Sequence, residues 1–258
     1  MSLPTSNTTS TTKVTATEAT GNESSVASGA STTTLLPCRV AMWFSALTGL
    51  FTFLFGVFMF LPDYWSVLIC MQLAWSYLCL TLGSKYSSIP NSATKNLFFA
   101  DMAIAFAIMY CTCNSIVYYV NVTFVENAKD TVAVGAVLSV VQQPPPSAFF
   151  SIEILGYTYL GISTIFLAYS ILDSAKSTQS NTMLLLVFVW IHGITSVVGF
   201  IIPFCDFVYK TEKDDENDEF YVFILLGWCA IFIPICIMLF LHYRRVLLLV
   251  SSHKVEDK

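Results

Sequence analysis

Charged residues are scarce in this chain. Only 11% of its 258 residues are Asp, Glu, Lys or Arg, whereas about a quarter of the residues in a soluble domain are charged. Hydrophobic residues make up 55%, and the mean hydropathy is +0.69. This balance excludes an ordinary water-soluble domain and indicates a protein that crosses a membrane several times. The net charge of −5 also leaves no basic surface that would favour nucleic acid.

Enzyme and cofactor signatures are missing as well. The sequence contains no H-E-x-x-H, no G-x-S-x-G and no P-loop lysine motif. His192 is the only one of three histidines deep within an apolar segment, which argues against cofactors that need paired axial histidines. The eight cysteines lie in or beside apolar segments, as small buried hydrophobes do. We therefore expect no catalytic residue, no metal site and no cofactor.

The first 36 residues differ from the rest. Eighteen of them are Ser or Thr, and large apolar side chains are almost absent before Leu35. Such a segment cannot bury enough surface to offset its ordering entropy, so residues 1–36 are predicted to be a disordered tail. It contains no apolar stretch typical of a signal peptide, and the first span is expected to direct membrane insertion itself.

Six apolar segments of spanning length follow the tail. An unpaired backbone is too costly in hydrocarbon, so each is expected to be a helix. The prediction is an all-α, polytopic membrane bundle of six transmembrane helices over residues 37–246, with a short C-terminal tail at 247–258. The spans are about 38–61, 64–83, 97–120, 149–172, 183–207 and 220–243.

The distribution of Lys and Arg predicts the orientation. With six spans both termini lie on one side, and nine of the twelve basic residues fall there, against Lys129, Lys210 and Lys213 on the other. Cytoplasmic loops carry the excess of basic residues, so both termini are predicted to be cytoplasmic. Glycosylation sequons at Asn7 and Asn22 point the other way, but they arise by chance in Ser/Thr-rich sequence, and the Lys/Arg count takes precedence.

A short apolar stretch lies between the third and fourth spans. Residues 131–141 are too few to cross a bilayer, and Pro144, Pro145 and Pro146 then favour an extended entry into span four. Two interpretations remain open: a surface element that caps the bundle, or a re-entrant loop.

The fourth span carries a glutamate on its small-residue face. At about 100° per residue, Glu153, Gly156, Tyr157 and Gly161 lie on one side, and bulky side chains occupy the other. Small residues let helix backbones approach closely, so this face is expected to look into the bundle.

Further polar residues lie on the fifth and third spans. His192, Gly199, Pro203 and Asp206 share one face of span five, and Asp101 lies near the inner end of span three. Ionisable groups within a membrane are costly and often functional. Glu153 and Asp206 are predicted to form an outer vestibule, His192 a mid-membrane relay and Asp101 an inner exit. The competing interpretation is that these groups only hold helices together, with Gly156, Gly161, Gly199 and Pro203 as packing positions.

Two functional hypotheses follow. The first is a transporter or channel-like protein for a small solute or cation, with or without coupling to protons. The second is a non-transporting membrane protein (a sensor, assembly factor or partner subunit) whose polar stripes are packing contacts. The expected partners are the lipid bilayer, a small solute or cation under the first hypothesis, and another copy or another membrane protein under the second.

Overall fold

The described part of the chain is helical. The computed structural model describes residues 35–58, 64–87, 94–120, 123, 148–177, 181–209 and 218–256, and side chains within 35–58, 68–87, 97–120, 123, 151–172, 181, 183–199 and 225–252. Its six helices are α2 (Leu35–Phe58), α3 (Tyr64–Ser87), α4 (Thr94–Val120), α6 (Ala148–Ser177), α7 (Thr182–Tyr209) and α8 (Asp218–Glu256). The predicted all-α fold is confirmed.

Each helix coincides with one predicted span, with differences mainly at the ends. The largest difference is in α8, which continues past the predicted end at Tyr243 to Glu256 and so includes most of the predicted C-terminal tail. Helix α2 begins at Leu35, two residues inside the segment assigned to the amino-terminal tail. The rest of that tail, the 131–141 stretch and the three prolines after it lie outside the described residues.

The composition of the helices is compatible with a membrane protein. Four of them contain a segment long and apolar enough to cross a bilayer: 35–58 in α2, 97–120 in α4, 151–172 in α6 and 225–252 in α8. Large apolar side chains on the outside, among them Trp43, Phe53, Phe98 and Ile194, are more than half exposed. In α7 the apolar stretch found within the described residues is shorter, Met183–Gly199. Six complete crossings therefore stay a prediction.

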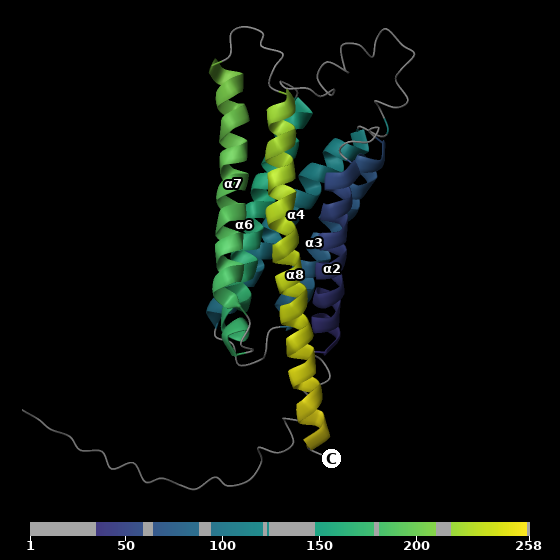
Figure 1. Ribbon diagram of the computed structural model, residues 1–258, viewed down its shortest axis with the longest axis vertical. Coiled ribbons are helices and arrows are strands. Elements are labelled where there is room, and N and C mark those ends of the chain that lie inside the picture. The colour runs from purple at the N-terminus through teal and green to yellow at the C-terminus, as the bar shows by residue number, and fades with distance from the viewer. Residues whose placement is uncertain are drawn as a thin grey trace, which may run out of the picture.

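The six helices form a closed ring. Neighbours pack in the order α2, α3, α4, α6, α7, α8 and back to α2, and α3 also meets α6 across the middle (Figure 1). At one end, the Cys38 thiol lies 3.5 Å from the backbone oxygen of Tyr243, which joins α2 to α8. A Cβ on Gly83 would lie 2.8 Å from the backbone nitrogen of Ala41, so α2 and α3 are also in close contact there. The start of α2, the end of α3 and the later turns of α8 thus share one end of the bundle, and the last turns of α8 extend beyond it (Figure 1).

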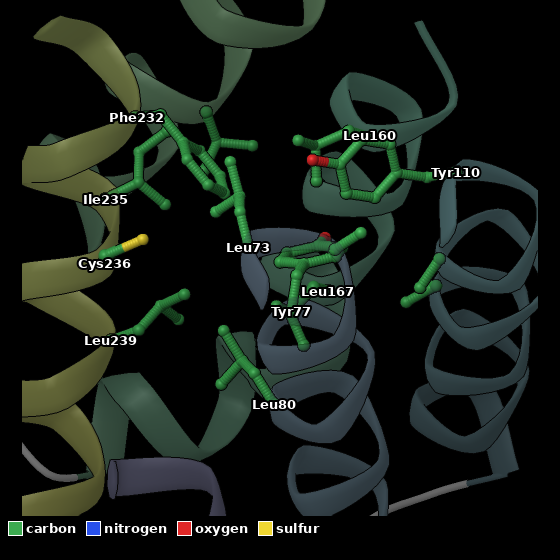
Figure 2. Packing of buried hydrophobic residues seen from close by; sticks show 14 of the residues in the cluster. Leu73, Tyr77, Leu80, Tyr110, Leu160, Leu167, Phe232, Ile235, Cys236 and Leu239 are labelled. Carbon is green, nitrogen blue, oxygen red and sulfur yellow. The ribbon is translucent and has the colours of Figure 1, made fainter. Parts of the chain in front are cut away.

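Side chains fill the middle of the ring. Phe232 and Ile235 project from α8 toward Leu73 and Tyr77 of α3, and Tyr110 projects inward from α4 (Figure 2). All five are fully buried. Because tyrosines are part of this packed interior, it combines apolar rings with hydroxyl groups.

Candidate functional site

Glu153 lies inside the bundle, hydrogen-bonded to tyrosines. Its side chain is only 6% exposed. Tyr118 of α4 donates its hydroxyl to Glu153 Oε1, and the Tyr157 hydroxyl, one turn along α6, lies 3.5 Å from the same oxygen. The two phenol oxygens are 3.3 Å apart, and the sulfur of Cys70 on α3 is 3.8 Å from the Tyr157 oxygen. Three helices thus meet at this group of four residues, which we call the Glu153 cluster.

The chemistry of this cluster suits a carboxyl group that exchanges a proton. A buried carboxylate is costly unless donors surround it, and a phenol provides one O–H donor while it can also accept a hydrogen bond. Glu153 lies five residues after the start of α6, roughly 8 Å along the helix. Glu153 therefore lies nearer to this end of α6 than to its middle.

Gly156 brings α4 close to this cluster. A Cβ at Gly156 would lie 2.9 Å from Asn114 Oδ1 and 3.2 Å from the Cβ of Cys113. Asn114 is fully buried, and its side-chain oxygen and nitrogen have no hydrogen-bond partner among the described residues. The glycine thus leaves room for a polar side chain one turn before Tyr118 on α4.

A second hydrogen-bonded group lies further along α6. The hydroxyl of Tyr77 on α3 donates to Ser163 Oγ at 3.0 Å and lies 3.2 Å from Thr164 Oγ1. Ser163 in turn donates to the backbone oxygen of Ala103 on α4 at 2.6 Å. This Tyr77 cluster (Tyr77, Ser163, Thr164 and the Ala103 carbonyl) joins the same three helices as the Glu153 cluster.

His192 is enclosed by aromatic rings. It is fully buried, its ring is stacked on Phe232 with centroids 4.8 Å apart, and Trp228 lies 5.2 Å away. Neither ring nitrogen has a hydrogen-bond partner within the part of the chain that is described. Trp228 also touches Tyr157, with centroids 5.0 Å apart. His192 is therefore linked to the Glu153 cluster through Trp228 and Tyr157.

Helices α6 and α7 are in close contact at Gly161. A Cβ there would lie 2.5 Å from the Cβ of Ser196 and 3.4 Å from the Cα of Gly193. Thr158 Oγ1 lies 3.2 Å from the backbone oxygen of Ser196, and the indole N–H of Trp228 donates to Ser196 Oγ at 3.2 Å. Ser196 thus connects α6, α7 and α8.

The other predicted pathway residues lie apart from this centre or outside the described side chains. Asp101 is 57% exposed and forms an ion pair with Lys85 of α3 at 2.5 Å, and this hydrogen bond raises the pKa of Lys85 above its ordinary value. Pro203 and Asp206 belong to α7, but their side chains are not described, and Gly199 is half-buried. Glu153 and His192 are thus linked through aromatic rings, and Asp101 marks one end of the bundle.

Several residues of the site are absent from the sequence-based pathway. They are Tyr118, Tyr77, Tyr110, Trp228 and Asn114. The four aromatic residues are missing because aromatic side chains in a lipid-like sequence usually serve as apolar bulk, and Asn114 is missing because it carries no charge. The spacing contains a signal: Tyr110, Asn114 and Tyr118 recur every four residues on α4, and Tyr157 follows Glu153 by four. Such spacing places them on one helical face.

Comparisons with known protein families, with characterised proteins and with solved structures give no match to this chain. Among the described residues, no group of three His, Cys, Asp or Glu side chains is arranged to hold a metal ion. The functional inference therefore depends on the chemistry of the residues themselves.

Proposed function

We propose that this protein is a transporter or channel-like protein that moves a small solute or cation in a manner linked to protons, with Glu153 as its proton-binding group. The observation that carries the proposal is the burial of the Glu153 carboxyl beside the hydroxyls of Tyr118 and Tyr157. Even near the end of a spanning helix, a buried carboxyl is more costly than a buried hydroxyl. Serine or threonine could form a packing contact at a lower cost.

The ring of helices supports this proposal. Polar groups occur along its interior, and apolar side chains cover its exterior. In the proposed function, Glu153 and Asp206 lie toward the outer side, His192 lies deep and the exposed Asp101 lies toward the inner side. The basic residues Arg39, Lys85, Arg244 and Arg245 lie on helix segments that share the Asp101 end, as the predicted cytoplasmic side would require.

The test is proton flux into liposomes that contain the purified protein. Potassium and valinomycin compensate charge, and a trapped pH dye reports the flux after an external acid step. The wild type is expected to carry protons at least about ten times faster than Glu153→Gln, because the amide cannot bind and release a proton. A tenfold loss of rate corresponds to an increase of about 1.4 kcal/mol in the activation free energy of the rate-limiting step.

Thr112→Val is the matched control, because Thr112 is exposed and its hydroxyl donates to the backbone oxygen of Ile108 in its own helix. This variant should conduct like the wild type. If Glu153→Gln conducts at the wild-type rate with the same amount of folded protein, the proposed role of Glu153 is wrong.

A second candidate function is a non-transporting sensor, assembly factor or partner subunit. The close contact between Gly161 and Ser196 favours it, because small residues and hydrogen bonds are what hold helices together in lipid. Under this alternative, liposomes with the wild type show no proton flux above protein-free liposomes. The proposed transporter is taken to carry protons without added solute, so the flux measurement separates the two functions.

A further inference from the structure

The two hydrogen-bonded clusters lie at different depths along α6. The Glu153 cluster uses residues 153 and 157 of this helix, and the Tyr77 cluster uses residues 163 and 164. Eleven residues separate Glu153 from Thr164, which corresponds to roughly 16 Å along an α-helix. Each cluster joins α3, α4 and α6, so the two are stacked at one three-helix junction.

Tyr110 lies between the two clusters. Its ring centroid is 6.1 Å from that of Tyr77 and 6.2 Å from that of Tyr157, so it touches one tyrosine of each cluster. The side chain is fully buried and projects from α4 toward the middle of the ring (Figure 2). Its hydroxyl has no hydrogen-bond partner among the described residues. A buried hydroxyl without a partner is costly, and this one belongs to a ring that contacts a tyrosine of each cluster.

We propose that Tyr110 relays protons between the Glu153 cluster and the Tyr77 cluster. This inference rests on the proposed function and names the route that begins at Glu153. When the route operates, the Tyr110 hydroxyl accepts a hydrogen bond from Tyr157 and donates one to Tyr77. Because a phenol oxygen lies on the axis about which its ring flips, forming these bonds requires a change in χ1 of the tyrosines, whose ring centroids lie 6.1–6.2 Å apart.

Each transfer step conserves the number of protons. Protonated Glu153 gives its proton to the Tyr157 oxygen as Tyr157 passes its own proton to Tyr110, Tyr110 passes its proton to Tyr77, and Tyr77 passes its proton to Ser163. For the last transfer the Ser163 hydroxyl turns away from the Ala103 carbonyl, to which it donates in the resting structure, and passes its original proton to a water molecule that enters from the inner side. Every hydroxyl ends with one proton, and Glu153 ends as a carboxylate. The hydroxyls then rotate about their C–O bonds before the next transfer.

The neighbouring polar groups are less suited to this step. His192 is in contact with the rings of Trp228 and Phe232, and the amide of Asn114 does not readily release a proton. The other titratable groups near Tyr110 are the thiols of Cys70 on α3, Cys111 on α4 and Cys229 on α8. Tyr110 has a ring contact with a tyrosine of each cluster.

The decisive variant is Tyr110→Phe, which removes one oxygen and keeps both ring contacts. In the liposome assay it should lower proton flux at least tenfold. Tyr159→Phe is the matched control: it removes the same atom from a half-buried tyrosine on the opposite side of α6, in ring contact with Phe106. It should conduct like the wild type, and all variants are compared at equal amounts of monodisperse protein.

A second measurement distinguishes a relay from a structural role. Infrared difference spectra record the C=O band of the protonated Glu153 carboxyl, identified by its loss in Glu153→Gln, after a pH step on one side of oriented liposomes. In Tyr110→Phe the response to an inner pH step should slow at least tenfold, and the response to an outer step should stay unchanged.

The outcomes separate the two proposals. If Tyr110→Phe conducts and responds like the wild type while Glu153→Gln loses its flux, the relay is wrong and the proposed function stands. If both pH responses of Tyr110→Phe slow equally, Tyr110 has a structural role and the relay is also wrong. If wild-type flux does not exceed that of Glu153→Gln, the proposed function fails.

Discussion

Replacing Gly161 by leucine should leave little folded protein. Its first side-chain atom would lie 2.5 Å from the Cβ and 2.6 Å from the Oγ of Ser196, well inside van der Waals contact. Extra carbons in a packed interior typically cost about 1–3 kcal/mol. Leucine adds four carbons where two backbones meet, so we expect at least about 3 kcal/mol, a large part of the 5–15 kcal/mol that stabilises a typical protein.

The measurement is the fraction of monodisperse protein after detergent extraction, together with the denaturant midpoint of unfolding. Gly227→Leu is the matched control, because among the described residues a Cβ at Gly227 would meet no atom within 4 Å beyond its chain neighbours and its own helix backbone, and the position is exposed on α8. It should behave like the wild type. Equal yields and midpoints for the two leucine variants would show that the α6–α7 contact does not limit stability.

A smaller change tests the same contact by compensation. Gly161→Ala places only a Cβ against Ser196, and Ser196→Gly removes the atoms that it meets. The double variant should be more stable than the sum of the single effects predicts, because the clash exists only when both side chains are present. Ser196→Gly alone is measured as well, because it also removes the acceptor of the Trp228 indole.

The number and position of the described helices could be predicted from the sequence because lipid imposes a length. Each of the six apolar runs is about as long as a bilayer crossing, and each became a helix. The end of α8 could not be predicted in this way. Arg244 and Arg245 end the apolar run, but no glycine or proline follows, and the leucine-rich stretch at 246–250 continues the helix.

The inward face of α6 could be predicted, but its neighbours could not. Helical periodicity gives the direction of a side chain and not the identity of the helix opposite. Gly156 and Gly161, which were grouped on one face, lie about 140° apart at 100° per residue. Gly156 accordingly meets Asn114 on α4, whereas Gly161 meets Ser196 on α7. One broad face thus serves two interfaces.

The partners of the ionisable residues depend on contacts between distant segments. Tyr118 is 35 residues from Glu153 in the chain, and Lys85 is 16 residues from Asp101. From composition alone the tyrosines are interpreted as apolar bulk. Their hydroxyls, however, provide the hydrogen bonds that make a buried carboxyl tolerable. The charged residues could be identified from the sequence, but the neutral groups that surround them required the fold.

Replacing Trp228 by alanine should have the second largest effect on stability. Its indole is 4% exposed and touches the rings of Tyr157, His192 and Phe232 with centroids 5.0–5.2 Å apart. Buried Trp→Ala changes cost about 3–5 kcal/mol in soluble proteins. We expect the loss of stability to be at the lower end of this range, about 3 kcal/mol. In lipid there is little hydrophobic driving force between helices, so the loss comes mainly from the missing packing contacts.

Trp43→Ala is the control for this substitution, because Trp43 on α2 is 62% exposed. Its denaturant midpoint should stay near that of the wild type, and a Trp228→Ala midpoint equally close to the wild type would contradict the packing role. Trp228→Phe keeps an aromatic ring but loses the hydrogen bond to Ser196, which is worth about 1 kcal/mol. A loss near this value would assign most of the Trp228 contribution to ring packing between the Glu153 cluster and His192. A loss as large as that of alanine would assign it to the hydrogen bond that ties α8 to α7.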